Sequence, residues 1–231
     1  MVAELPPVTA LRQLDTARLI PSRYSIPDDS VLARIAGDDA TLAVIFDLDN
    51  ATNDRLLAEA NLLPGIGVDE LVFGVAHYRI INAAFAHAHP LGSRFNGPDR
   101  GAWYAGFSKD TSLAEVIFHK TVALKEVNWF HDQTSYDVYL ADLAAEFHDI
   151  RTLSSYADCL APDSYIAAQS LAASLLDAGA AGLIYPSVRH PGGTCIACFR
   201  PAVVSHVRKT ERLRLTWTGT ETPSVALDQT Y

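Results

Sequence analysis

Apolar residues recur with two different periods along the chain, and the changes of period divide it into expected strands and helices. Residues 102–107, Ala-Trp-Tyr-Ala-Gly-Phe, predict a short aromatic strand. A helix is predicted to begin near Thr111, where Ser108 or Asp110 can cap its first turn. Further strands are expected at 136–143, 181–185 and 194–199. This mixture of strands and helices is typical of an α/β or α+β fold.

The segments between these elements are interpreted from their composition and caps. Residues 70–85 contain Val, Phe, Tyr and Ile with little alternation, so we expect largely buried strands there. Residues 152–162 favour a loop, and a helix capped by Asp163 or Ser164 is expected to run through Asp177. The middle of the chain is therefore expected to form a mixed sheet with helices around it.

The two ends of the chain are expected to lie outside this core. Residues 1–69 are interpreted as a mostly helical N-terminal extension, with helices over 31–35 and 53–62. Residues 206–231 are polar and aperiodic, which is typical of a mobile C-terminal tail. A chain of 231 residues can bury a core as one compact domain, and we place that domain at residues 70–205.

Charge and cysteine content narrow the class of protein. The net charge of −9 and the pI near 5.2 argue against a nucleic-acid-binding surface, because phosphate neutralisation needs clustered Lys and Arg. No apolar run is long enough to cross a bilayer, and the first residues lack the features of a signal peptide. Three cysteines form no even set of disulfides, so we expect a cytoplasmic protein.

Two pairs of potential metal ligands have better structural explanations. Cys195 and Cys198 have a redox or metal spacing, but they lie in an apolar run that is typical of a buried strand. His87 and His89 would share one face of a strand, yet no matching Cys or carboxylate set accompanies them. We therefore expect no metal site.

The stretch from residue 92 to residue 120 carries three chemically useful side chains, Arg94, Tyr104 and Glu115. Its expected strand–turn–strand–helix unit would present a cation, an aromatic hydroxyl and a carboxylate on adjacent rigid elements. Each residue alone also has an ordinary explanation, as a surface arginine, a core-strand tyrosine and a solvated glutamate. Their combination is what indicates a site.

The same stretch resembles the RES-domain family, which is named for an Arg, a Glu and a Ser. The resemblance rests on ordered motifs: Ile80-Ile81-Asn82-Ala83-Ala84-Phe85, Arg94-Phe95-Asn96, Gly101-Ala102-Trp103-Tyr104-Ala105, and Thr111 to Glu115 with His119. The serine of the family name is found at Ser187, after Gly182-Leu183-Ile184-Tyr185-Pro186. The resemblance covers roughly residues 70–205.

The resemblance implies a toxin of a bacterial toxin–antitoxin pair that consumes NAD, with a compact fold related to ADP-ribosyltransferases. NAD would be a consumed substrate rather than a bound cofactor, and the sequence has no Gly-rich Rossmann fingerprint. The implied reaction breaks the nicotinamide–ribose bond by phosphorolysis or hydrolysis, with inorganic phosphate or water as the acceptor. The implied partner is a cognate antitoxin, commonly with an Xre-type DNA-binding domain.

The chemistry of the site residues suits this implied reaction. Arg94 can grip a phosphate with two nitrogens, and Tyr104 offers a ring for stacking and a hydroxyl for hydrogen bonding. Glu115 can stabilise a ribosyl cation and orient the nucleophile. Further substrate-binding candidates are Ser187, Asn96 and Arg100.

Two alternative functions remain open from the sequence. A mono-ADP-ribosyltransferase would use the same residues but pass ADP-ribose to a protein side chain. A non-catalytic module would bind the ligand without turnover. The site residues do not separate the possible acceptors, because all these transfers share the ribosyl cation.

Overall fold

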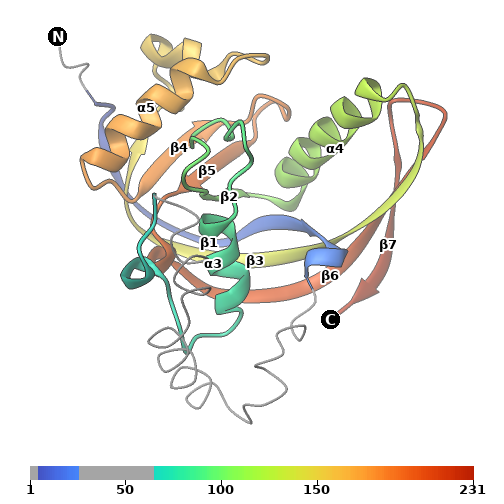
Figure 1. Cartoon of the computed structure of the whole chain (residues 1–231), viewed down its shortest axis with the longest axis horizontal. Helices are drawn as coiled ribbons and strands as arrows, with labels where there is room; N and C mark the ends of the chain where they lie inside the picture. The colour runs from blue at the N-terminus through green and yellow to red at the C-terminus, as the bar shows by residue number, and fades with distance from the viewer. Residues whose placement is uncertain (1–4, 26–64) are drawn as a thin grey trace.

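The computed structural model describes residues 5–25 and 65–231. These residues form one seven-stranded sheet in the order β1-β2-β5-β4-β3-β6-β7 (Figure 1). The β3–β4 pair is parallel and the others are antiparallel, so the sheet is mixed, as predicted. The strands are β1 (Val8–Pro21), β2 (Trp103–Gly106), β3 (His131–Asp149), β4 (Gly182–Pro186), β5 (Thr194–Cys198), β6 (Val204–Thr218) and β7 (Ser224–Thr230).

The long strand β1 closes part of the sheet on itself. It pairs with β3 along its whole length, ending at Pro21↔Tyr136, and also pairs with β2 at Ala17↔Gly106. The path β1-β2-β5-β4-β3 therefore returns to β1 and forms a ring, whereas β6 and β7 continue from β3 outside it. This closure brings β1 to the side of β2, despite their separation in sequence.

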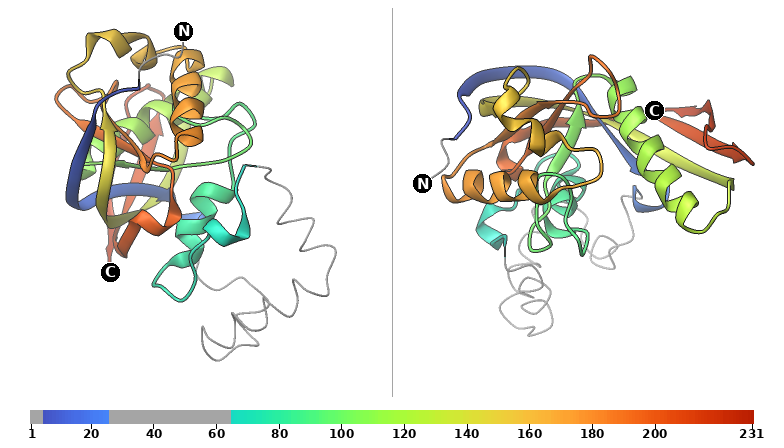
Figure 2. Two further views of the ribbon diagram at one scale, coloured as in Figure 1. Left: turned by 90° about the vertical axis from the view of Figure 1, so that its left-hand side faces the viewer. Right: turned by 90° about the horizontal axis from the view of Figure 1, so that it is seen from above.

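Two long helices cover different ends of the sheet. α4 (Lys109–Glu126) packs through Leu124 into a cluster with Val138 of β3 and Leu215 of β6. α5 (Ile166–Asp177) buries Ala168, Ala172 and Leu175 against β4 and β5. Figures 1 and 2 show these helices apart, with β2 and the chain before it between them. The shorter helices are η1 (Ser22–Tyr24), η3 (Val68–Glu70), α3 (Tyr78–Ala86), η4 (Ser154–Leu160) and η5 (Pro201–Val203).

The elements around the predicted site are confirmed. Ser108 is the N-cap of α4, with an extended backbone and a hydroxyl that accepts a hydrogen bond from the Thr111 amide at 3.2 Å. β2 and β5 fall within the expected strands, β4 is shifted by one residue from the expected 181–185 and ends at Pro186, and β3 contains the expected 136–143. α5 begins later than predicted, because its N-cap is Tyr165 and that residue makes no side-chain cap.

The prediction of strands at residues 70–85 is wrong. The segment holds the end of η3, a loop and the helix α3. The buried residues of α3 are Ile81, Ala84 and Phe85, which recur at the spacing of one helix face. The Asn82 side chain exchanges hydrogen bonds with the backbone of Val72 at 2.8 and 3.0 Å and so ties the loop to the helix. Aromatic and β-branched content misled the interpretation because tertiary packing overrides such propensities.

The prediction of a mostly helical N-terminal extension is wrong for the residues that the structure describes. Residues 8–21 form β1, and their pairing with β3 fixes them as a strand. The helices expected at 31–35 and 53–62 lie outside the described residues.

The prediction of a mobile C-terminal tail at residues 206–231 is also wrong. β6 pairs with β3 and buries alternate residues, including Leu213, Leu215 and Trp217. Among the described strands, β7 pairs with β6 alone, and all of its residues are exposed. An exposed edge strand has no buried face, which explains why its sequence looked aperiodic.

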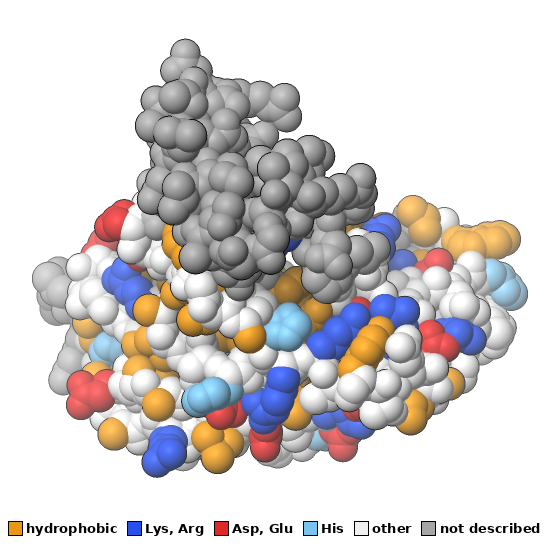
Figure 3. Space-filling model, turned by 90° about the horizontal axis from the view of Figure 1, so that it is seen from below, with side chains coloured by type: hydrophobic (Ala, Val, Ile, Leu, Met, Phe, Trp, Pro, Cys, Tyr) orange, Lys and Arg blue, Asp and Glu red, His pale blue; other side chains and the backbone are white. Residues whose placement is uncertain are grey.

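The outer surface carries charges of both signs. Figure 3 shows one face, on which Lys and Arg side chains lie interspersed with Asp and Glu side chains. Among the described helices, none is long and apolar enough to span a membrane.

Candidate active site

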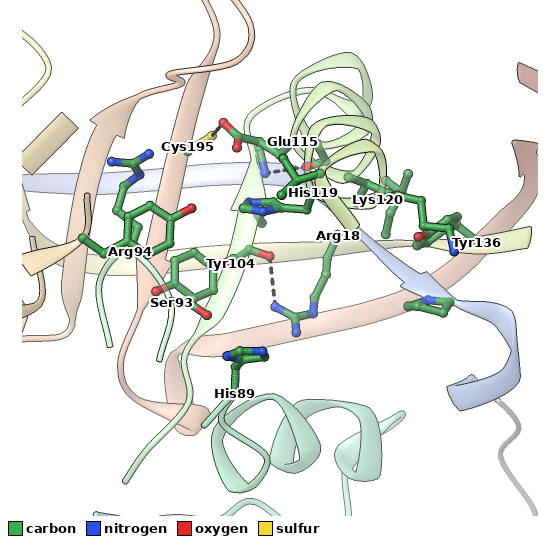
Figure 4. A pocket seen from close by; sticks show the side chains of 18 of the residues that line it. Arg18, His89, Ser93, Arg94, Tyr104, Glu115, His119, Lys120, Tyr136 and Cys195 are labelled. Atoms are coloured by element: carbon green, nitrogen blue, oxygen red, sulfur yellow. Dashed lines mark hydrogen bonds between the residues drawn. The ribbon is translucent and has the colours of Figure 1, made fainter. Parts of the chain in front are cut away.

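A cavity of about 800 Å³ lies between α4, β1, β2 and the loop that precedes β2 (Figure 4). Its volume is within the range of small-molecule and cofactor sites. The polar and aromatic side chains that line it are Arg18, His89, Ser93, Arg94, Tyr104, Ser112, Glu115, His119, Lys120, Glu126, Tyr136, Tyr165, Tyr185 and Cys195. Three of the predicted site residues, Arg94, Tyr104 and Glu115, therefore meet in one cavity.

Glu115 faces the cavity from the second turn of α4. The Ser187 hydroxyl donates a hydrogen bond to its Oε1 atom at 2.7 Å, and the Cys195 thiol lies 3.8 Å from the same oxygen. Oε2 has no hydrogen-bond partner among the described residues. The carboxylate is thus held by one oxygen and presents the other to a ligand.

Ser187 lies behind Glu115 rather than on the cavity wall. Its hydroxyl accepts hydrogen bonds from the backbone amides of His190 and Arg189 at 2.9 and 3.2 Å while it donates to Glu115. The same loop is fixed to the start of α4 by a 3.0 Å contact between His190 Nδ1 and Thr111 Oγ1. These bonds use the hydrogen-bonding capacity of the hydroxyl, so Ser187 is placed to position Glu115.

Arg94 enters the cavity from the loop before β2. Its Nη1 atom donates to the carbonyls of Ala161 and Cys159 at 2.7 and 3.2 Å, and its guanidinium lies 4.7 Å from the ring centre of Tyr165. Nε and Nη2 have no partner within the part of the chain that the structure describes. Arg94 therefore has a fixed direction and free donors for an anion.

Tyr104 and Asn96 organise the wall between the loop and β2. The Tyr104 hydroxyl donates to Asn96 Oδ1 at 2.8 Å and accepts from the Phe95 amide at 2.9 Å. Burial raises the pKa of Tyr104, so the phenol stays neutral. Tyr104 lines the cavity, whereas Asn96 is not among its lining residues and acts through Tyr104.

Arg100 is not brought to the site. Its guanidinium forms two hydrogen bonds with Glu70 at 2.8 and 2.9 Å and donates to the carbonyls of Gly65 and Phe199. The pair joins η3 to the loop before β2, and the bond to Phe199 ties both to the end of β5. Because these contacts hold the surrounding loops together, we assign Arg100 a role in the fold rather than in the cavity.

Sequence reasoning missed Arg18, which reaches the cavity from β1 (Figure 4). Its Nη1 atom donates to the Tyr104 carbonyl at 3.1 Å, and its guanidinium lies 4.9 Å from the Trp103 ring centre. Burial lowers the pKa of Arg18 to about 10, so it remains a cation at neutral pH. Its Nε atom is buried without a hydrogen-bond partner in the described structure. No motif marks Arg18, because only the pairing of β1 brings it to the site.

His119 and Cys195 are the titratable neighbours of Glu115. His119 follows Glu115 by about one helical turn, so both lie on one face of α4. Burial lowers the pKa of His119; nearby Glu115 opposes this effect, and Arg189 and Arg94 add to it. Burial, with the Glu115 charge, raises the pKa of Cys195 to about 12. Near neutral pH, His119 is therefore a neutral imidazole and Cys195 a thiol.

The potential metal ligands do not form a cluster. His87 is the C-cap of α3, so the expected strand that would align it with His89 is absent there. Cys195 and Cys198 lie buried in β5 as free thiols. Within the described ranges, no group of three or more His, Cys, Asp or Glu side chains is arranged to hold a metal.

Comparisons with known proteins identify the family. No curated protein matches the chain. Among solved structures, it resembles one described as the crystal structure of the M. tuberculosis MbcT–MbcA toxin–antitoxin complex, with 17% identity and a TM-score of 0.43. That alignment covers 58% of this chain and 75% of the other. The RES domain matches residues 71–218, which is more than half of the sequence, and the chain therefore belongs to the RES domain family.

Proposed function

We propose that this protein degrades NAD by cleaving its nicotinamide–ribose bond and acts as the toxin of a toxin–antitoxin pair. The observation that carries the proposal is the carboxylate of Glu115, held by Ser187 and facing a large cavity that also contains Arg94 and Arg18. A fixed negative charge can stabilise an oxocarbenium-like ribose, and two arginines suit the two phosphates of NAD.

The bond changes follow from this arrangement. The bond between the ribose C1′ atom and the nicotinamide nitrogen breaks, and its electron pair stays with nicotinamide, which leaves as a neutral base. Glu115 stabilises the positive charge that develops on the ribose. An acceptor oxygen then bonds to C1′. When the acceptor is water, neutral His119 can accept the proton that it loses.

Product analysis tests this reaction and identifies its acceptor. Purified protein is incubated with NAD in buffers with and without inorganic phosphate, and the products are separated and weighed by mass spectrometry. Phosphorolysis gives nicotinamide and ADP-ribose phosphorylated at the anomeric carbon, whereas hydrolysis gives free ADP-ribose. A mass increase on a protein would favour the alternative mono-ADP-ribosyltransferase, and tight binding without products would favour a non-catalytic module.

Arg18→Met is expected to raise KM for NAD by about 10-fold or more, since a hydrogen bond to a charged group contributes ~1.5–3 kcal/mol. Methionine keeps apolar contact with Trp103 but removes the charge near the cavity. Steady-state kinetics and a melting curve of each variant provide the measurement. Arg18→Lys should recover part of the affinity, because it restores the charge without the planar fork. An unchanged KM in a folded Arg18→Met variant would contradict the binding role.

Ser187→Ala is expected to lower kcat by about 10-fold, the size of one lost hydrogen bond of ~1–2 kcal/mol, with a smaller change in KM. The reason is that Ser187 touches Glu115 and not the cavity. Ser187→Thr keeps the hydroxyl and should restore much of the rate. A rise in KM with an unchanged kcat would instead show direct substrate contact.

The proposal includes a cognate antitoxin with an Xre-type DNA-binding domain. This part of the proposal rests on membership of the RES domain family. An enzyme that drains a central cofactor needs an inhibitor in the cell that makes it. Expression of the chain alone should slow growth, and Glu115→Gln should remove that effect. Normal growth with active enzyme and falling NAD would contradict the toxin role.

A further inference from the structure

The cavity is long, because the residues that line it extend along most of α4. The residues of α4 that line the cavity begin at Ser112 and end at Glu126. A helix advances ~1.5 Å per residue, so these positions lie about 20 Å apart along the axis. That distance is much longer than a nicotinamide riboside bound at Glu115 would need.

β1 forms the opposite wall over part of this length, from Arg18 to Pro21. The Ser112 hydroxyl donates to the Ala17 carbonyl at 2.6 Å and fixes the first turn of α4 to β1. From that point β1 runs to Pro21, which pairs with Tyr136 of β3, and both residues line the cavity. Residues of α4 and of β1 line the same cavity, and the part of it between these two elements is called the channel below.

The chemistry of the wall changes along the channel. The near arm contains the charged and reactive groups, Arg94, Tyr104, Glu115, His119 and Cys195. The far arm is more apolar: it contains Leu19, Pro21, Val116, Val122 and Tyr136, together with two charged residues, Lys120 and Glu126.

The far arm is poorly suited to a second phosphate. Its cation, Lys120, is already paired with Asp132 at 2.8 Å. Figure 4 shows Arg18 between the two arms, with Glu115 on one side and Tyr136 on the other. Along the channel, the Glu115 carboxylate comes first, then the Arg18 guanidinium with its unpartnered Nε atom, and then the more apolar far arm.

We infer that the far arm binds the second nucleoside of the dinucleotide, while Arg18 contacts the diphosphate that joins the two halves. This inference rests on the proposed function and assigns the orientation of its substrate. The two faces of a nucleobase are flat and suited to stacking, so they gain from contact with the valine, proline and tyrosine surface of the far arm. The enzyme should therefore require a complete dinucleotide, because nicotinamide mononucleotide would fill only the near arm.

The test compares NAD with nicotinamide mononucleotide on wild-type protein and on Val122→Trp. Val122 lines the far arm and is 37% exposed, so a larger side chain can fill the arm without disturbing the core. Wild-type kcat/KM is expected to favour NAD by about 100-fold or more. Val122→Trp should reduce this preference about 10-fold, which corresponds to ~1.4 kcal/mol.

Val127→Trp is the matched control. Val127 follows α4 as its C-cap, is 69% exposed and does not line the cavity, so this variant should keep the wild-type preference. Equal kcat/KM for both substrates in wild type, or an unchanged preference in a folded Val122→Trp variant, would overturn the inference.

Calorimetry with ADP separates this inference from the proposed reaction, because ADP binding needs no turnover. Val122→Trp should weaken ADP binding about 10-fold and Val127→Trp should leave it unchanged. If wild type consumes neither substrate yet shows this binding pattern, the proposed reaction fails and the nucleoside site stands. If ADP binds equally to wild type and Val122→Trp, the nucleoside site fails whatever the reaction.

Discussion

Replacing Glu115 with glutamine is expected to lower the rate of NAD cleavage by about 100-fold or more, equivalent to ~3 kcal/mol of transition-state stabilisation. The amide keeps the shape of the side chain, and its oxygen can still accept the hydrogen bond from Ser187. It loses the negative charge that would stabilise the ribosyl cation. Nicotinamide release, followed by chromatography, measures the effect.

The control for this variant is Glu146→Gln, which removes a carboxylate of the same kind from the exposed surface of β3. Its rate should equal that of wild type. Calorimetric binding of NAD should persist in Glu115→Gln, because the arginines and the apolar walls are unchanged. Wild-type turnover in a folded Glu115→Gln variant would exclude Glu115 as the catalytic carboxylate.

Replacing Asp137 with asparagine is expected to reduce the free energy of unfolding by about 3 kcal/mol, the lower end of the cost of breaking a buried ion pair. Asp137 is fully buried on β3 and contacts Arg212 at 2.6 Å, Lys209 at 2.7 Å and Ser22 at 3.0 Å. Its carboxylate thus joins β6 to η1, which directly follows β1, and asparagine would leave both cations without this counter-charge. Urea denaturation measures the loss.

The same carboxylate predicts how stability depends on pH. Burial alone would raise the pKa of Asp137, but hydrogen bonds from Arg212 and Lys209 outweigh it and hold the pKa well below its usual range. A folded pKa below the unfolded one gives stability that is complete above pH ~4 and is lost as the pH falls towards the folded pKa. Asp137→Asn should flatten this acid dependence. Asp163→Asn, at an exposed position, should leave the acid dependence of stability unchanged. Identical profiles of stability against pH in the two variants would contradict the assignment of this dependence to Asp137.

Local patterns predicted the parts of the fold that depend on local chemistry. The cap at Ser108 and the strands β2, β4 and β5 follow from short-range signals and are confirmed. β1 could not be predicted, because its polar and apolar residues become a strand only by pairing with β3. β7 could not be predicted for a different reason: this edge strand buries neither face, so its sequence shows no alternation of apolar and polar residues.

The residues of the candidate site likewise fall into those that local sequence patterns predict and those that only long-range contacts bring there. Arg94, Tyr104 and Glu115 lie close in sequence and on adjacent elements, so their meeting could be predicted. Arg18 reaches them only through the closure of the sheet by β1. Arg100 shares its turn with the site residues, but its pairing with Glu70 is a long-range contact that no local pattern reveals.

A crystal structure of Glu115→Gln with NAD tests the central claim most directly, because this variant should bind the substrate without cleaving it. The ribose C1′ atom is expected within ~4 Å of the Gln side chain that replaces Glu115. The diphosphate should lie within hydrogen-bond distance of Arg18, at ~3 Å, and the adenosine between β1 and α4. NAD bound outside this cavity, or inside it with the nicotinamide ribose away from position 115, would contradict the account.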